Sequence, residues 1–206
     1  MPAPAYVALE GPEGCGKSTQ ARLLADRLDA VLTRETGGTA VGERLRAILH
    51  DVAVTDLDAR AEALMIAADR AQHLAQVVRP ALAAGRHVVS DRSVYSSLAY
   101  QGFGRQLPVD EVRAINEWAL RGTWPTVAIL LDVPAEEIER RLRSRHLDRF
   151  ERESAEFHTR VAEGFRAMAA ADPDRWIVVG ADDAPERVAA AIAAEVADRL
   201  SSVVRP

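Results

Sequence analysis

The chain has 206 residues, of which 48% are hydrophobic and 28% are charged, and its formal net charge is -5. This length and composition predict one folded domain, 1–206, rather than a disordered chain. The negative charge argues against a nucleic-acid partner, because general nucleic-acid binders normally carry a basic surface.

The expected compartment is the cytoplasm. No apolar run is long enough to span a bilayer, so we expect no membrane contact, and residues 1–5 lack the basic start of an export signal. The single cysteine, Cys15, excludes an internal disulfide and fits a reducing environment. The five histidines are scattered without the spacing of a zinc site.

The predicted elements alternate between short β-branched runs and longer helical patterns. In chain order, the predicted strands are residues 6–10, 31–33, 87–91, 127–132 and 176–179. The predicted helices are residues 17–28, 40–51, 57–84 with a break near Pro80, 93–101, 109–121, a helix from 135 that runs into 140–152, then 153–170 and 184–200. This alternation predicts an α/β fold, a three-layer sandwich in which a five-stranded parallel sheet carries helices on both faces. Ligands of such folds bind beyond the carboxyl ends of the strands.

A phosphate-binding loop follows the first predicted strand. Residues 11–18 match the pattern G-x-x-x-x-G-K-[ST], and the loop stands between a strand and a helix as the motif requires. The glycines allow successive backbone N–H groups to face one phosphate, and the helix adds its positive end. Lys17, the only lysine in the chain, is expected to reach the β- and γ-phosphates. The motif predicts a P-loop NTPase fold in which ATP is bound by Gly11, Pro12, Glu13, Gly14, Cys15, Gly16, Lys17, Ser18 and Thr19.

The P-loop by itself does not select a reaction, but the composition narrows the choice. A GTPase needs the guanine-reading motif N-K-x-D, which is impossible here because Asn116 is the only asparagine and Lys17 the only lysine. Motor and transporter ATPases are usually larger than this chain. A kinase that acts on a small substrate remains.

Several further segments resemble the bacterial thymidylate kinases, in the order in which that family has them. They are residues 10–19, 33–39, 91–92, 99–102 and 147–151. The resemblance extends from Tyr6 to about Leu200. It implies that the protein phosphorylates dTMP to dTDP with ATP and Mg²⁺, in dTTP biosynthesis. It also implies a homodimer, for which the predicted helix 57–84 is a candidate interface.

The resemblance assigns roles to individual residues. Glu13 is expected to accept a hydrogen bond from the 3′-hydroxyl of dTMP, and Ser18 and Asp91 to hold Mg²⁺. Arg92 is expected to contact the acceptor phosphate. Structural alternatives stay open for three residues: Glu13 as a solvated loop residue, Arg46 as a surface arginine and Tyr100 as a packing residue of its helix. The implied dTMP site comprises Glu13, Glu35, Arg46, Ile66, Arg70, Arg92, Ser96, Ser97, Tyr100 and Gln101.

An arginine-rich segment at about 140–152 resembles the lid of the family. A run of arginines is often a solvated face, but in a kinase a lid arginine can neutralise the charge of the transferring phosphoryl group. We expect that arginine to be Arg145 first, then Arg149 or Arg141, and we also assign Arg141 and Arg145 to ATP. The implied catalytic set is Lys17, Asp91, Arg92, Arg145 and Arg149.

The chain departs from the family pattern at three positions. Thr36 replaces a usual proline, Ser93 replaces a usual tyrosine or histidine, and Ile66 replaces the phenylalanine that stacks on thymine. Two alternatives to dTMP phosphorylation stay open. One is a kinase for another nucleoside monophosphate or a deoxynucleoside, and the other is a P-loop module that binds nucleotide without catalysis.

Overall fold

The computed structural model describes residues 3–143 and 147–202. Within them the chain forms one parallel sheet with the order β2-β3-β1-β4-β5. The strands are β1 (Tyr6–Glu10), β2 (Val31–Arg34), β3 (Val88–Asp91), β4 (Val127–Asp132) and β5 (Trp176–Gly180). The predicted α/β fold and five-stranded parallel sheet are confirmed. Because β1 pairs with both β3 and β4, the strand order reverses beside β1, where such sheets bind ligands.

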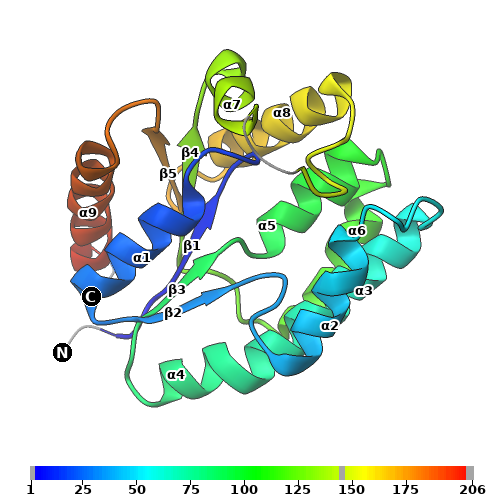
Figure 1. Cartoon of the computed structure of the whole chain (residues 1–206). Helices are drawn as coiled ribbons and strands as arrows, with labels where there is room; N and C mark the ends of the chain where they lie inside the picture. The colour runs from blue at the N-terminus through cyan, green and yellow to red at the C-terminus, as the bar shows by residue number, and fades with distance from the viewer. Residues whose placement is uncertain (1–2, 144–146, 203–206) are drawn as a thin grey trace.

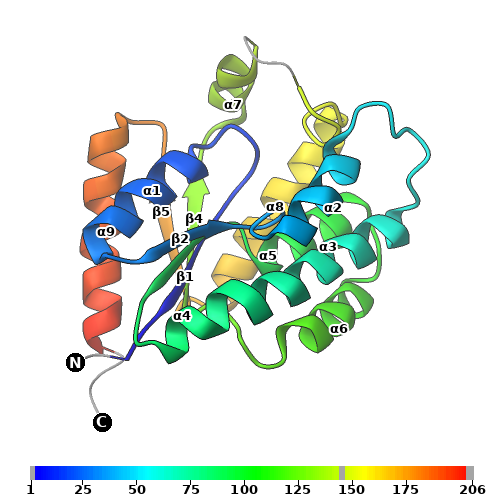
Figure 2. The same cartoon turned by 60° about the horizontal axis from the view of Figure 1, so that its bottom comes forward.

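Helices cover the two faces of the sheet, and each face has its own apolar core (Figures 1 and 2). One face carries α1 (Lys17–Leu28) and α9 (Pro185–Ser202), which pack against each other and against the sheet. The larger core lies on the other face. Its helices and those around it are α2 (Ala40–His50), α3 (Ala59–His73), η1 (Leu74–Val78), α4 (Arg79–Ala83), α5 (Val94–Ser97), η2 (Leu98–Gly104), α6 (Val109–Leu120) and α8 (Ala155–Ala171). The remaining helix, α7 (Ala135–Leu142), packs Ile138 against the first core.

The predicted long helix 57–84 consists of three consecutive segments. It begins at Ala59 because the Asp58 side chain caps it, accepting from the backbone N–H of Arg60 at 2.9 Å. The break falls on the π-helix η1, just before Pro80, rather than at the proline itself. A proline ring clashes with the carbonyl four residues earlier, and a wider turn relieves that contact.

A second π-helix, η2, continues α5 and carries Tyr100 and Gln101. The sequence predicted only a helix here, because a π turn leaves no clear mark in hydrophobic spacing. In the described residues, no helix combines the length and the apolar character that a bilayer crossing requires.

Candidate active site

The loop between β1 and α1 depends on glycine at two positions. Gly11 has a φ of 140°, and a Cβ there would lie 2.9 Å from both the Cys15 Sγ and the Leu131 carbonyl oxygen. Gly16 precedes α1 with a φ of 100°. Because neither position tolerates a side chain, the loop keeps a tight path that leaves its N–H groups for a ligand. Cys15 is buried inside this loop as a small filler.

Lys17, Ser18, Thr19 and Asp91 line a cleft above this loop, which we call the P-loop pocket. Lys17 starts α1, and its Nζ donates to the Pro12 carbonyl at 2.7 Å. Ser18 Oγ donates to Asp91 Oδ2 at 2.5 Å, so the ends of α1 and β3 meet here. Gly11 and Pro12, which were also predicted to bind ATP, do not line this pocket.

The Ser18 hydroxyl and the Asp91 carboxylate fit a magnesium ion. Mg²⁺ in kinases typically takes one or two protein oxygens and completes its shell with phosphates and water. Among the described residues, no three His, Cys, Asp or Glu side chains gather into a separate metal site. Ser18 and Asp91 are the pair of side chains next to the P-loop that could hold such an ion.

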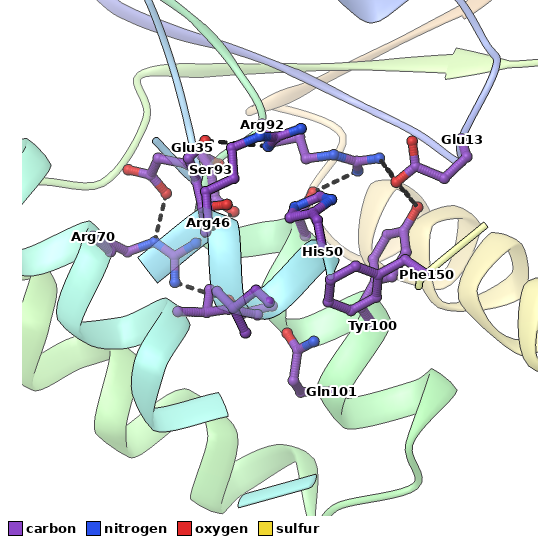
Figure 3. A pocket seen from close by; sticks show the side chains of 15 residues that line it. Glu13, Glu35, Arg46, His50, Arg70, Arg92, Ser93, Tyr100, Gln101 and Phe150 are labelled. Carbon is purple, nitrogen blue, oxygen red and sulfur yellow. Dashed lines mark hydrogen bonds and ion pairs between the residues drawn. The ribbon is translucent and has the colours of Figure 1, made fainter. Parts of the chain in front are cut away.

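A second cavity, the inner pocket, opens beside the P-loop pocket (Figure 3). All ten residues that the sequence assigned to the acceptor nucleotide line it, although they come from β1 to η2 and are up to 88 positions apart (Glu13 and Gln101). The inner and P-loop pockets share Glu13, Glu35, Arg46, His50 and Arg92 as lining residues. The two pockets therefore form one continuous cleft.

Arg92 stands where the two pockets meet. Its Nη2 donates to Glu13 at 2.5 Å and to the Tyr100 hydroxyl at 3.2 Å, and its Nη1 donates to Ser96 Oγ at 3.0 Å. Burial opposes the ionisation of Glu13, but the charges of Arg92 and Lys17 outweigh it and lower the pKa of the Glu13 carboxyl. Arg92 has a φ of 72°, a strained backbone held where β3 ends.

Arg70 forms the buried wall of the inner pocket. Its Nε donates to Glu35 at 2.8 Å, and its other nitrogens donate to Ser97, Asn116 and the Ser93 carbonyl. The second Glu35 oxygen binds His73 Nδ1 at 2.8 Å. Burial opposes ionisation of Glu35, but Arg70 and His73 outweigh it and lower the pKa of its carboxyl. This network fixes the loop after β2 against α3.

The far end of the inner pocket is less charged. Ile66, Leu49 and Phe150 give the inner pocket its apolar lining. The Gln101 amide points into the cavity on the opposite side from Glu13 (Figure 3). Arg46 lines both pockets and donates to the Thr36 carbonyl at 3.2 Å. The pocket thus has a cationic end beside the P-loop and an apolar end that carries one amide.

Arg141 and Arg149, two of the arginines predicted for the lid, do not line this cleft. Arg149 donates to the Leu49 carbonyl at 2.7 Å and to Glu62 at 2.6 Å, and it lines neither pocket. Arg141 lies on the other side of the P-loop, where it donates to the carbonyls of Gly14 and Ala181. Arg145 lies outside the described residues.

The sequence analysis assigned no role to five residues of the inner pocket: Thr36, Leu49, His50, Ser93 and Phe150. Phe150 belongs to the segment 147–151, whose resemblance could have indicated it. Leu49 and His50 end α2, and only the packing of that helix brings them to the cleft. His50 Nδ1 lies 2.7 Å from Asp148 Oδ2, which ties α2 to the segment before α8.

Glu10 is a fully buried acid directly beneath this site. Its two oxygens accept from Ser93 Oγ and Ser96 Oγ, each at 2.6 Å, and Ser96 in turn binds Arg92. Burial raises the pKa of Glu10 from 4.5 to about 7, against the opposing effect of the two hydroxyl groups. An acid at the end of an otherwise apolar strand was the sequence signal that could have indicated it.

We expect Glu10 to make stability fall as pH rises. The folded state keeps the Glu10 proton up to about pH 7, whereas the unfolded chain releases it near pH 4.5. The contribution of the protonated Glu10 to the unfolding free energy is therefore complete below pH 4.5 and is lost as the pH rises to 7. Relative to Glu10→Gln, the unfolding free energy of the wild type should drop by on the order of 3 kcal/mol across that range. Urea unfolding of both proteins at several pH values measures this, and a pH-independent difference between them would contradict it.

Comparisons with known proteins agree with this geometry. The sequence model of the family "Thymidylate kinase" matches residues 9–192. A Synechococcus thymidylate kinase is 46% identical over 98% of this chain and 94% of its own length. A Desulfovibrio desulfuricans thymidylate kinase is 45% identical over 89% of this chain and 90% of its own. The crystal structure of thymidylate kinase from Ehrlichia chaffeensis superposes with a TM-score of 0.79 at 28% identity, covering 95% of this chain and 99% of that one. The chain therefore belongs to the thymidylate kinase family.

Proposed function

We propose that this protein transfers the γ-phosphoryl group of ATP to dTMP, giving ADP and dTDP. The observation that carries the proposal is the continuous cleft in which Glu13 and Arg92 line both the P-loop pocket and the inner pocket. ATP phosphates would lie on the P-loop and the dTMP phosphate beside Arg92. Two anions held end to end are what phosphoryl transfer between nucleotides requires.

The cationic end of the inner pocket suits the acceptor phosphate. Arginine matches a phosphate because its planar fork can bind two oxygens at once, and Arg92 and Arg46 both face this end. Glu13 and Tyr100, joined at 3.3 Å, would then lie against the deoxyribose, with Glu13 accepting from the 3′-hydroxyl. The base would enter the apolar end, between Ile66 and the Gln101 amide.

The reaction needs neither a general base nor a covalent intermediate. An acceptor phosphate oxygen is already anionic at neutral pH, so the protein has to align it with the γ-phosphorus, neutralise charge and exclude water. Lys17 and Arg92 would supply the neutralising cations. Mg²⁺ held by Ser18 and Asp91 would add charge on the donor phosphates. Arg145 and Arg149 stay predictions for the lid.

The nucleoside part of ATP needs a binding site apart from the phosphates. A third cavity lies on the far side of the P-loop, lined by Gly16, Thr19, Arg141 and Pro185 among others. We assign the nucleoside of ATP to this cavity. The Arg141 guanidinium is oriented there by Glu137 at 2.6 Å and by the Ala181 carbonyl at 2.9 Å.

The test is an acceptor panel. Purified protein with ATP and Mg²⁺ is offered dTMP, dUMP, UMP, dCMP, AMP and thymidine, and ADP formation is followed by a coupled assay. We expect dTMP to give the highest kcat/KM. A different best acceptor would reassign the chain to another nucleotide, and ATP consumption that does not depend on any acceptor would favour a binding module.

Replacing Ile66 by phenylalanine should tighten dTMP binding. The Ile66 side chain is buried at the apolar end of the pocket, and an aromatic ring there adds a stacking contribution of about 0.5–1.5 kcal/mol. The Kd for dTMP should therefore fall by up to about tenfold, measured by calorimetry. Ile66→Leu is the matched control, because it adds no ring. Unchanged or weaker binding in Ile66→Phe would refute the prediction.

We also propose a cytoplasmic homodimer. Leu64 on α3 and Trp118 on α6 are 56% and 83% exposed, and these two helices pack side by side. We assign the dimer contact to these exposed apolar side chains. Trp118→Asp should give monomers in light scattering, whereas Arg187→Ala, an exposed change on α9, should not. A wild type that is already monomeric would reject the dimer.

A further inference from the structure

The amide of Gln101 has a fixed orientation in the inner pocket. Its Nε2 donates to Glu62 Oε1 at 2.8 Å, while its Oε1 is buried and accepts no hydrogen bond from the residues that the structure describes. Gln101 lines the cavity, and its amide points inward (Figure 3). A buried acceptor without a partner costs free energy, so this oxygen is suited to a ligand that brings a donor.

Glu62 determines which end of that amide faces the pocket. Its carboxylate is fully buried and accepts from Arg105 at 3.2 and 3.1 Å and from Arg149 at 2.6 Å, besides Gln101. An ionised carboxylate accepts hydrogen bonds and donates none. If Gln101 turned over, its oxygen would face the Glu62 oxygen at hydrogen-bonding distance, and both acceptors would be repelled. Glu62 therefore holds the Gln101 oxygen toward the cavity.

We propose that Glu62 is a positioning residue that sets base specificity, by locking Gln101 as a hydrogen-bond acceptor. The inference rests on the proposed dTMP kinase function and deepens it. Thymine and uracil carry an N–H donor at N3, whereas cytosine has an acceptor at N3. An amide oxygen held toward the base accepts from the first two and repels the third. Glu62 itself touches no substrate.

The variant Glu62→Gln should invert this arrangement. Arg105 and Arg149 donate to the carboxylate, so they will hold the single amide oxygen of the new glutamine, and its NH₂ group will face Gln101. Gln101 then turns over to accept from that group, and its own NH₂ group faces the pocket. The pocket now offers a donor, which fits the acceptor N3 of cytosine and not the N–H of thymine.

The experiment compares kcat/KM for dTMP, dUMP and dCMP in the wild type and Glu62→Gln, both checked for folding by thermal unfolding. We expect the dTMP-to-dCMP ratio to fall by at least about tenfold in the variant, because hydrogen-bond matching is the strongest source of discrimination in such pockets. The dTMP-to-dUMP ratio should stay constant, since both bases present the same N–H. Glu62→Asp keeps an acceptor-only side chain and should retain the wild-type order of substrates.

Arg105→Gln is the matched control. It removes an ion pair of Glu62 and the pair with Glu153 at 2.6 Å, but it leaves the carboxylate that holds Gln101, so its dTMP-to-dCMP ratio should equal that of the wild type. Should Glu62→Gln fail to fold, the double variant with Arg105→Gln removes one of the two cations that no longer face a carboxylate at position 62. This double variant is then compared with Arg105→Gln alone, and its dTMP-to-dCMP ratio of kcat/KM should again be at least about tenfold lower.

Two outcomes overturn different claims. If the wild type phosphorylates dTMP and discriminates against dCMP, but Glu62→Gln loses activity equally on all three nucleotides, Glu62 is merely structural and this inference is wrong. If the wild type does not phosphorylate dTMP, the proposed function itself is wrong.

Discussion

Replacing Arg92 by alanine is expected to lower kcat/KM for dTMP by at least about 10³-fold, the lower end of what a catalytic arginine contributes to phosphoryl transfer. Two effects combine. The acceptor phosphate loses its bidentate partner, and Glu13, which Arg92 contacts at 2.5 Å, becomes an unpaired anion facing the incoming phosphate. A coupled assay with dTMP measures the loss.

A double variant separates these two effects. Adding Glu13→Gln to Arg92→Ala removes the unpaired negative charge, so the double variant should regain part of the lost kcat/KM, although Glu13 is itself expected to bind the sugar. Arg92→Lys keeps the charge but not the fork, and should fall between wild type and Arg92→Ala. If Arg92→Ala retained near-normal kcat/KM, the acceptor phosphate would not lie beside Arg92.

The backbone of Arg92 provides a check on folding. With a φ of 72°, an alanine at this position is strained in the folded state, whereas a glycine is not. Arg92→Gly should therefore unfold at a higher temperature than Arg92→Ala while both are equally inactive. A parallel loss of activity and stability across the two variants would indicate a structural role instead.

Replacing Lys17 by alanine should lower kcat by at least about 10²-fold, the usual cost of removing one donor to developing negative charge. Lys17 is 6% exposed at the start of α1, and its Nζ places a cation at the loop, where it donates to the Pro12 carbonyl at 2.7 Å. Binding of ADP should weaken far less than kcat falls, because the loop N–H groups hold the remaining phosphates. Arg86→Ala, an exposed change just before β3 and so at the end of the sheet opposite the cleft, is the control for kcat. A loss of ADP binding as large as the loss of kcat would contradict this role.

Much of the fold could be predicted from local sequence. The strands were placed to within one residue, and α1 was placed at its observed bounds, because β-branched runs, helical spacing and the glycines of the P-loop are local signals. The π-helices η1 and η2 were missed, since the extra residue in a π turn is decided by packing and by Pro80 rather than by composition.

Some side chains of the cleft could likewise be predicted from local sequence, and others could not. The motifs around Lys17, Asp91 and Arg92 indicated the side chains at the strand ends, because parallel strands bring their carboxyl ends to one edge. That Arg149 binds Glu62 and the Leu49 carbonyl rather than lining the cleft could not be predicted, since both partners lie far from it in sequence.

The sequence by itself determined the phosphate loop, the parallel sheet and the residues gathered at its edge, because each depends on side chains that are neighbours along the chain. Only the tertiary structure decided how buried polar groups share their partners. The pKa of Glu10 depends on its burial beneath α5, and the orientation of the Gln101 amide depends on Glu62, which lies on α3. Desolvation and hydrogen-bond satisfaction are set by three-dimensional neighbours, and no spacing in the chain encodes them.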